Sequence, residues 1–347
     1  MGNALRNFAT PGQPVVDPSV WIGKELDARS DWQVQVEADE FEELEKMAGA
    51  LRSRVSSDPN GLLALPLSAF DLGRFGKKID TIRRELKDGT GAVLIRGLRM
   101  DVLDTLGAAI IYWAIGRHLG TACSNNPQGD MLGHVTDLGK TQKDANSRGY
   151  QTREELTFHC DQSSIVGLLC VRTAKAGGIS KIASSVAVYN ELLRRDPECA
   201  EVLSKPLCWS KHGEVNEGEL GFYESPVFNF HDGMLCTSFG PTHITKGHQV
   251  DGAPPMTELQ RRAIGSVKSI AEELHYAMTL RPGDIQLLNN SVVFHSRTEY
   301  EDWPDPTKKR LLYRLWLIAP DVRPLTPYVT QWKAGVKLNS TKERIVL

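Results

Sequence analysis

Two segments that lie far apart in the chain carry the pattern that most constrains its fold. The first, Leu156-Thr-Phe-His-Cys-Asp-Gln162, reads as the end of a strand. Successive side chains of a strand point to opposite faces, so His159 and Asp161 face one point in space and Cys160 faces away. The second segment ends a later strand at His295. A fold that joins these residues needs short strands whose inward side chains converge.

Two imidazoles and one carboxylate can occupy one face of an octahedral metal ion and leave three positions open. This ligand set is the one expected of a non-haem Fe(II) oxygenase. The His159-x-Asp161 pattern is weak evidence by itself, because a surface histidine and a turn aspartate produce it often. The metal interpretation therefore depends on the residues that come after His295.

Those residues include a buried strand with two arginines, Lys308-Lys-Arg-Leu-Leu-Tyr-Arg-Leu-Trp-Leu317. Arg310 and Arg314 are four residues apart, so they lie on the same face and are expected to point inward beside the metal. A buried arginine needs an anion, and its planar guanidinium fits a carboxylate in bidentate fashion. The pattern predicts a site for a dicarboxylate that chelates iron.

With these segments in place, the chain resembles the taurine dioxygenase and clavaminate synthase-like family of Fe(II)/2-oxoglutarate-dependent oxygenases. The matching motifs run in order from about residue 90 to about residue 320, and they are specific as a set rather than singly. They are Phe158-His-Cys-Asp161, Gly167-Leu-Leu-Cys-Val-Arg172, Gly177-Gly178, Pro282-Gly-Asp-Ile285, Asn289-Asn290, His295-Ser-Arg297 and Arg310-Leu-Leu-Tyr-Arg-Leu-Trp316.

The resemblance implies an α+β fold, with a double-stranded β-helix (jelly-roll) core flanked by helices. It implies that His159, Asp161 and His295 bind Fe(II). It also implies that 2-oxoglutarate is the cosubstrate and that its far carboxylate pairs with Arg310. The glycine patterns of dinucleotide-binding and P-loop proteins are absent from the sequence.

The resemblance also suggests substrate-binding residues. Arg314 lies one inward step past Arg310, where relatives hold an anionic group of their substrate. The alternative role for Arg314 is a structural salt bridge, for example with Asp284. Asp130 and His134 fall in the region that lines the substrate pocket of relatives, although an ordinary polar loop explains each of them equally well.

One position departs from the family pattern. In relatives, a threonine binds the 2-oxoglutarate carboxylate opposite the arginine, and alignment on Gly177-Gly178 puts Ala183 at that place. We expect that Ser184 or Ser185 replaces the missing hydroxyl, or that this hydrogen bond is absent.

The implied reaction is oxidation of an unactivated C–H bond of a small anionic metabolite by dioxygen, with release of succinate and CO2. Hydroxylation, desaturation and ring closure all fit. Related halogenases lack the carboxylate ligand, so Asp161 disfavours halogenation. Two alternatives remain open. One is a metal-dependent hydrolase, which needs a general base beside the metal. The other is a non-catalytic jelly-roll binding protein.

Composition limits the partners. The chain is 41% hydrophobic and 24% charged, with a formal net charge of −2, which allows a sizeable core and does not indicate nucleic acid as a partner. No apolar run is long enough to cross a membrane. The six cysteines are scattered without a Cys-x-x-Cys pair, so we expect reduced thiols. We expect a cytoplasmic protein, with a homo-oligomer as one option.

We expect a single domain over residues 1–347. Its parts are an N-terminal arm and helix (1–60), the jelly-roll core with inserted helices (61–320) and a C-terminal tail (321–347). Trp21 and Trp32 are expected to anchor the arm.

Other segments have simpler local interpretations. A helix is expected to begin at Thr257-Glu-Leu-Gln260, which has the capping-box pattern. Residues 137–152 are polar and contain glycines, which suits a loop that closes over substrate. Asn289 and Asn290 are expected to tie down backbone. His243 and His248 lie in a segment rich in glycine and proline, and we expect no function for them.

Overall fold

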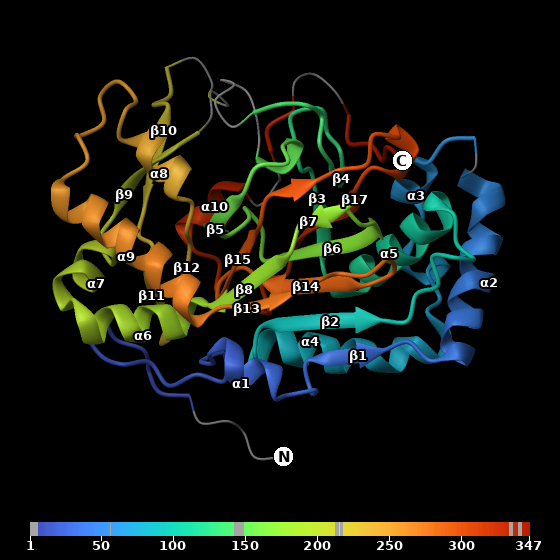
Figure 1. Ribbon diagram of the computed structural model, residues 1–347, viewed down its shortest axis with the longest axis horizontal. Coiled ribbons are helices and arrows are strands. Elements are labelled where there is room, and N and C mark those ends of the chain that lie inside the picture. The colour runs from blue at the N-terminus through green and yellow to red at the C-terminus, as the bar shows by residue number, and fades with distance from the viewer. Residues whose placement is uncertain are drawn as a thin grey trace.

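Two β-sheets form the centre of the molecule, and helices pack around them (Figure 1). The computed structural model describes residues 6–55, 57–141, 149–211, 215, 218–332, 336–338 and 342–347. The expected α+β architecture with a jelly-roll core is confirmed. The division into arm, core and tail stays a prediction.

The larger sheet has long apolar strands at its middle. β6 (Ile165–Arg172) pairs antiparallel with both β14 (Ile285–Asn289) and β17 (Leu311–Ile318), and nearly all of their residues are buried. A nearly continuous apolar strand is typical of a sheet that is covered on both faces. The remaining strands of this sheet are β1 (Gln33–Gln35), β2 (Ala92–Arg96), β3 (Thr121–Cys123) and β4 (Leu132–Val135).

The smaller sheet carries both halves of the metal motif. Its strand order is β13–β8–β15–β5, and all its pairs are antiparallel. The register places His295 of β15 directly opposite His159 of β5. The bounds of the strands are β5 (Leu156–His159), β8 (Ser180–Ser184), β13 (Tyr276–Met278) and β15 (Val293–Arg297).

Short strand pairs and helices complete the described chain. The pairs are β9 (Leu207–Ser210) with β10 (Phe222–Ser225), β11 (Phe228–His231) with β12 (Met234–Thr237), and β7 (Ala176–Gly177) with β16 (Tyr300–Glu301). The α-helices are α1 (Gly23–Asp27), α2 (Ala38–Val55), α3 (Gly61–Ala64), α4 (Ile79–Asp88), α5 (Thr105–Leu119), α6 (Ser185–Arg195), α7 (Pro197–Leu203), α8 (Pro241–Gly247), α9 (Glu258–Leu274) and α10 (Pro327–Trp332). The 3-10 helices are η1 (Leu67–Ala69), η2 (Gly73–Lys78), η3 (Gly149–Gln151) and η4 (Pro306–Lys308).

The helices form two groups that cover the two sheets. α4 and α5 contact strands of the larger sheet, whereas α6 and α9 contact strands of the smaller one. Figure 1 shows α6, α7 and α9 at one end of the molecule and α2 and α3 at the other. α9 begins at the expected capping box, because the Thr257 hydroxyl accepts from the Gln260 amide and the Gln260 side chain accepts from the Thr257 amide.

The two termini pack onto the body. Trp21 and Trp32 are each 1% exposed, and the Trp21 indole donates to the carbonyl of Thr90, so the expected anchoring of the arm is confirmed. At the other end, Ile345 is buried and its amide donates to the Asn60 side chain. The end of the segment after residue 320 therefore packs against the body.

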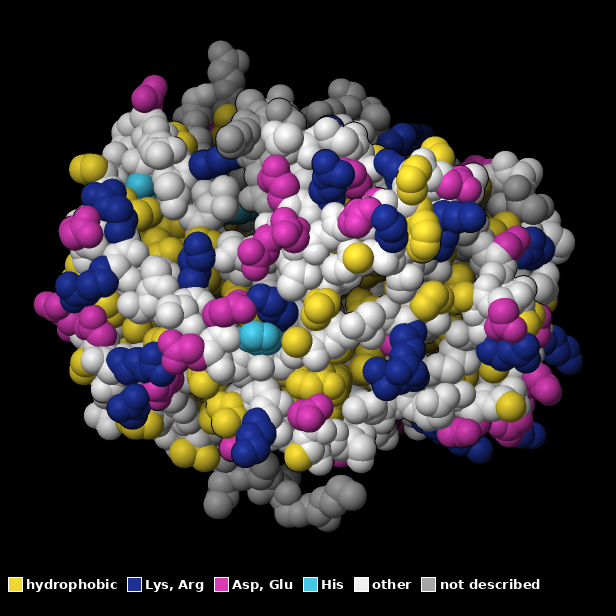
Figure 2. Space-filling view, in the orientation of Figure 1, with side chains coloured by type: hydrophobic (Ala, Val, Ile, Leu, Met, Phe, Trp, Pro, Cys, Tyr) yellow, Lys and Arg dark blue, Asp and Glu magenta, His cyan; other side chains and the backbone are white. Residues whose placement is uncertain are grey.

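Other expectations concern the molecule as a whole. All six cysteines are buried and none forms a disulfide. In the part of the chain that the structure describes, no helix is both long and apolar enough to cross a membrane. On the face shown in Figure 2, acidic and basic side chains are interspersed rather than gathered into a field of one sign.

Candidate active site

His159, Asp161 and His295 meet on the smaller sheet. The ring centroids of the two histidines are 4.3 Å apart. Asp161 Oδ1 lies 4.0 Å from His159 Nε2, and Asp161 Oδ2 lies 3.9 Å from His295 Nε2. One donor atom from each residue falls within 4.8 Å of the others. The three residues that the sequence analysis proposed as ligands are therefore close enough to hold one metal ion.

The protonation of the cluster suits a metal. His159 Nδ1 lies 2.8 Å from the carbonyl of Thr157, which can only accept, so the proton is on Nδ1 and the lone pair of Nε2 faces the cluster. Burial lowers the pKa of His295 to about 3, and the neighbouring His159 acts in the same direction. A neutral imidazole is the form that binds metal.

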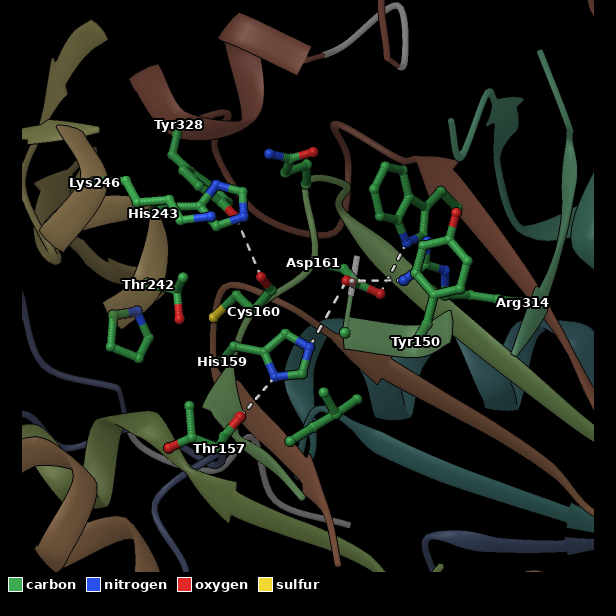
Figure 3. Close-up of a pocket in the computed structure, with 16 residues that line it drawn as sticks. Tyr150, Thr157, His159, Cys160, Asp161, Thr242, His243, Lys246, Arg314 and Tyr328 are labelled. Atoms are coloured by element: carbon green, nitrogen blue, oxygen red, sulfur yellow. Dashed lines mark hydrogen bonds and ion pairs between the residues drawn. The ribbon is translucent and has the colours of Figure 1, made fainter. Parts of the chain in front are cut away.

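The Asp161 carboxylate is held from behind by two residues of β17. The Trp316 indole donates to Oδ2 at 2.8 Å, and Arg314 Nη1 lies 3.4 Å from Oδ1 (Figure 3). Burial alone would raise the pKa of Asp161, but Arg314, the two histidines and the indole N–H together lower it. The carboxylate is therefore ionised, as a metal ligand must be.

The backbone around Asp161 is fixed from another direction. The Asn290 side chain accepts from the amide of Asp161 and donates to the carbonyl of Ser163. The Asn289 side chain donates to the carbonyl of Leu86. Both asparagines thus bind backbone, as expected, and Asn290 connects the two metal-motif segments.

A narrow chamber lies behind the cluster and contains two buried arginines. His159, Asp161, His295, Arg297 and Arg310 all line it. Each arginine is 5% exposed, and Nη1 of each has no hydrogen-bond partner among the residues that the structure describes. Burial, with the charge of Arg310 as a smaller cause, lowers the pKa of Arg297 to about 10. Two buried cations with spare donors are expected only where an anion binds.

The two guanidinium groups are positioned by Tyr300. The Arg297 carbon Cζ lies 4.7 Å from the ring centroid of Tyr300, and that of Arg310 lies 5.0 Å from it. Arg297 Nη2 also donates to the carbonyls of Thr152 and Glu154, so Arg297 ties the segment before β5 to the chamber.

A second, more open cavity of about 210 Å³ lies on the other side of the cluster. Its walls come from five parts of the chain: residues 149–150, the segment around β5, helix α8 with the residue before it, strand β17 and helix α10. In Figure 3, His243 and Lys246 of α8 lie on one side of His159, and Arg314 and Tyr150 lie on the opposite side. The hydroxyl of Tyr328 donates to the carbonyl of Cys160 and closes one wall.

Arg314 lines both cavities, but it already has a carboxylate partner. Its Nε donates to Asn125 Oδ1 at 2.9 Å, and its Nη1 contacts Asp161. Its guanidinium carbon lies 4.5 Å from the ring centroids of both Tyr150 and Trp316. The partner considered in the sequence analysis was Asp284; that choice was wrong, because the ion pair of Asp284 is with Arg96, at 3.7 Å.

Two proposed substrate residues lie elsewhere. Asp130 Oδ1 accepts from Arg344 at 2.6 Å, and His134 Nε2 lies 3.0 Å from the carbonyl of Val346. Neither lines the two cavities. The pairing of β4 with β17 sets His134 opposite Tyr313, one residue out of phase with Arg314, so its side chain faces away from the site. Both residues hold the C-terminal segment instead.

Ser184 and Ser185, which were expected to supply the hydroxyl for 2-oxoglutarate, lie outside the chamber. The Ser184 hydroxyl donates to the carbonyl of Ser19 and caps α6, and the Ser185 hydroxyl accepts from Thr237. Neither lines the chamber. The expectation that either one replaces the family hydroxyl therefore has no support in the structure.

Ser180 supplies a hydroxyl from β8 that lines the chamber, and Ser296 of β15 lines it as well. Along β8, Ser180 pairs with Arg297 and Ile182 with His295, whereas Ala183 pairs with Phe294. Strand alternation therefore puts Ser180 on the face of the metal ligand and Ala183 on the opposite face. The residue was missed because the expected position, Ala183, is out of phase with the inward residues of β8.

Two residues of α8 that line the open cavity were not predicted from the sequence. His243 was expected to have no function, and Lys246 was not considered, yet both line the cavity. His248 fits the expectation, since its ring nitrogens contact the carbonyl of Pro254 and the amide of Cys208. No signal in the sequence tells His243 from His248, because only the packing of α8 decides which one faces the site.

A jelly-roll core with an inward His–Asp–His cluster and an arginine chamber behind it is the architecture of a non-haem metal dioxygenase. Residues 64–316 match the family model described as taurine catabolism dioxygenase TauD, TfdA family, and the chain belongs to this family.

Individual relatives agree with this assignment. The chain is 29% identical to FR-33289 synthase of Streptomyces rubellomurinus over 330 residues, which cover 94% of this chain and 96% of that protein. It is 27% identical to taurine hydroxylase-like protein SAT17 of Stachybotrys chartarum, over 86% of this chain and 78% of that protein. Asparagine oxygenase, solved with Fe(II), hydroxyasparagine and succinate, has the same fold, with a TM-score of 0.65 and 18% identity over 83% of this chain and 93% of that one.

Proposed function

We propose that this dioxygenase uses Fe(II) and 2-oxoglutarate to oxidise an unactivated C–H bond of a small anionic metabolite. His159, Asp161 and His295 would hold the metal. Bound Fe(II) and 2-oxoglutarate supply the oxidising chemistry with dioxygen, and the cosubstrate leaves as succinate and CO2. Hydroxylation, desaturation and ring closure are all compatible with this site.

The observation that carries the proposal is the pair of buried arginines behind the metal cluster. Arg297 and Arg310 direct unpartnered Nη1 atoms at a chamber that the three metal-binding candidates also line. A dicarboxylate that chelates the metal at one end and reaches these arginines at the other would pair both charges. Ser180 lines the same chamber, and its hydroxyl would donate to the cosubstrate by turning away from Gln286 Oε1.

The residues of this chain perform the work around the cosubstrate. Arg310 and Arg297 orient its far carboxylate, so that its other end points at the cluster. Arg314 and Trp316 hold Asp161 in one orientation. Leu168, Leu280 and Leu312 line the chamber and exclude water from it.

The alternatives are less well supported. Among the described residues, Asp161 is the only carboxylate that lines either cavity, so a hydrolase would have no second carboxylate to act as a base. A binding protein would not need Asp161 to be ionised, oriented and left open to a cavity beside two imidazoles. An ionised and oriented Asp161 that is open to a cavity beside two imidazoles supports a catalytic metal ion.

The test is anaerobic reconstitution of the full chain with Fe(II) and 2-oxoglutarate. We expect a visible metal-to-ligand charge-transfer band, followed by release of succinate when oxygen is admitted. Arg310→Ala should lose the band at 2-oxoglutarate concentrations that saturate the native protein. Arg261→Ala, on the exposed face of α9, is the matched control and should keep it. A folded, iron-loaded protein without a band would overturn the proposal.

A further inference from the structure

Lys246 lines the open cavity and, within the described part of the chain, has no partner of opposite charge. Its side chain comes from α8 and is half-buried. No ion pair or hydrogen bond joins it to any of the residues that the structure describes, in contrast to the many paired surface lysines such as Lys175 and Lys205. A half-buried lysine without a counter-ion favours binding of an anion.

The other strong cation of the cavity is already neutralised. Arg314 contacts the ionised Asp161 and donates to Asn125. Asp161 is also the only carboxylate among the described residues of this cavity. No acidic side chain there is left for Lys246, so the positive charge that a ligand would meet is that of Lys246.

A second, independent donor faces the same cavity. Gln162 follows Asp161 in the chain, is 4% exposed and lines the cavity. Its Nε2 is buried and has no hydrogen-bond partner in the described ranges of the chain. A buried amide that lacks an acceptor is unfavourable unless a ligand supplies one. Lys246 and Gln162 thus both lack what an oxygen-rich anionic ligand would provide.

We propose that Lys246 binds an oxyanion group of the substrate, on the side of the metal cluster away from Arg314, while Gln162 donates to a substrate oxygen near the cluster. This assignment rests on the proposed function and makes it more specific. The substrate would be a small acid whose carboxylate, sulfonate or phosphonate group is separated from the oxidised carbon by the distance between α8 and the cluster (Figure 3). Arg314 would then orient Asp161 rather than carry the main charge contact.

The experiment measures binding of simple acids to the full chain loaded with Ni(II), which does not react, and 2-oxoglutarate. Pentanoate, butanesulfonate and butylphosphonate are titrated calorimetrically, with 1-pentanol as the neutral probe. We expect at least one acid to bind, and 1-pentanol to bind more weakly. Lys246→Met should weaken the acid by at least about tenfold, as loss of one charged contact typically does.

Two further variants separate charge from packing. Lys246→Arg keeps the charge and should retain most of the affinity that Lys246→Met loses. Lys268→Met, on the exposed face of α9, removes a lysine outside the cavity and should leave the affinity unchanged. Equal acid binding by the native chain and Lys246→Met would overturn the proposal, as would an alcohol that binds as well as the acids.

A further control distinguishes this proposal from the function on which it rests. The charge-transfer band of the native chain with Fe(II) and 2-oxoglutarate is recorded on the same preparation. A band together with no acid binding at millimolar concentration would overturn the assignment of Lys246 alone. Absence of the band would overturn the proposed function.

Discussion

The chamber behind the metal cluster and the open cavity in front of it are built differently. The two chamber arginines with unpartnered Nη1 atoms, Arg297 and Arg310, come from strand β15 and from the residue that leads into β17, and both are 5% exposed. The open cavity takes its unpartnered cation from α8, a helix of seven residues, and this lysine is only half-buried. One region is fixed by hydrogen-bonded strands, and the other by a short helix.

This difference suggests how one scaffold separates two binding tasks. A dicarboxylate cosubstrate needs the same geometry in every turnover, and strands paired on both sides hold side chains precisely. Side chains of a substrate site on α8 can be substituted without disturbing the pairing of the strands in the two sheets. We therefore expect substitutions in the chamber to affect metal or 2-oxoglutarate binding, and substitutions on α8 to affect the substrate alone.

The largest expected effect is at the cluster. Asp161→Ala removes a metal ligand, so metal affinity should fall by more than the roughly 10–100-fold that loss of an outer partner causes. Iron content after anaerobic loading and desalting measures this. Asp251→Ala, an exposed aspartate next to Gly252, is the control. Native-like iron retention by Asp161→Ala would show that the three residues do not form the metal site.

The second-largest effect is expected from substitution of the two chamber arginines, Arg297 and Arg310. Arg310→Ala removes charged hydrogen bonds, each worth about 1.5–3 kcal/mol, so the 2-oxoglutarate concentration needed for half-saturation should rise by roughly two orders of magnitude. Arg297→Ala should act in the same direction and also lower thermal stability, because Arg297 Nη2 binds the carbonyls of Thr152 and Glu154. If neither variant changes the titration of the charge-transfer band, the chamber does not hold the cosubstrate.

Trp316→Phe tests the support behind Asp161. The indole N–H donates to Oδ2 at 2.8 Å, and its loss should lower metal affinity by about 10–100-fold while the fold is retained. A titration with Co(II), followed by its visible spectrum, reads the affinity without turnover. Trp303→Phe, at an exposed position, is the matched control. An unchanged affinity would mean that Trp316 only fills space.

The sequence was sufficient for the parts of this site that depend on strand-like spacing, although Asp161 lies just after β5 and Arg310 just before β17. The spacing of His159 and Asp161 predicted a shared face, and the spacing of Arg310 and Arg314 predicted a second one. The structure agrees, since all four residues line the chamber. Local periodicity determines such faces, because neighbours along the strand fix them.

The parts that could not be predicted depend on which distant segments pack together. Lys246 faces the cavity only because α8 packs on β9 beside it. The role of Trp316 requires that β17 lie next to the loop that carries Asp161. Asp130 and His134 were misplaced for the same reason, because their partners, Arg344 and Val346, lie near the end of the chain.

Ser180→Ala is expected to have the smallest effect on 2-oxoglutarate binding. It tests which part of β8 lines the chamber. Ser180 shares the inward face of β8 with Ile182, and its hydroxyl donates to Gln286 Oε1 at 3.2 Å. If this hydroxyl turns from Gln286 to the far carboxylate of 2-oxoglutarate when the cosubstrate binds, loss of the hydroxyl should raise the half-saturating concentration by up to roughly tenfold.

Ser184→Ala is the matched control for this test, because the same residue type is removed four positions along the same strand. It should cost about 1 kcal/mol of stability through the lost cap of α6, yet leave 2-oxoglutarate binding unchanged. The reverse result would mean that Ser184, and not Ser180, lies beside the cosubstrate, because the two serines share one face of β8. The comparison of the two serines therefore decides which end of β8 borders the bound 2-oxoglutarate.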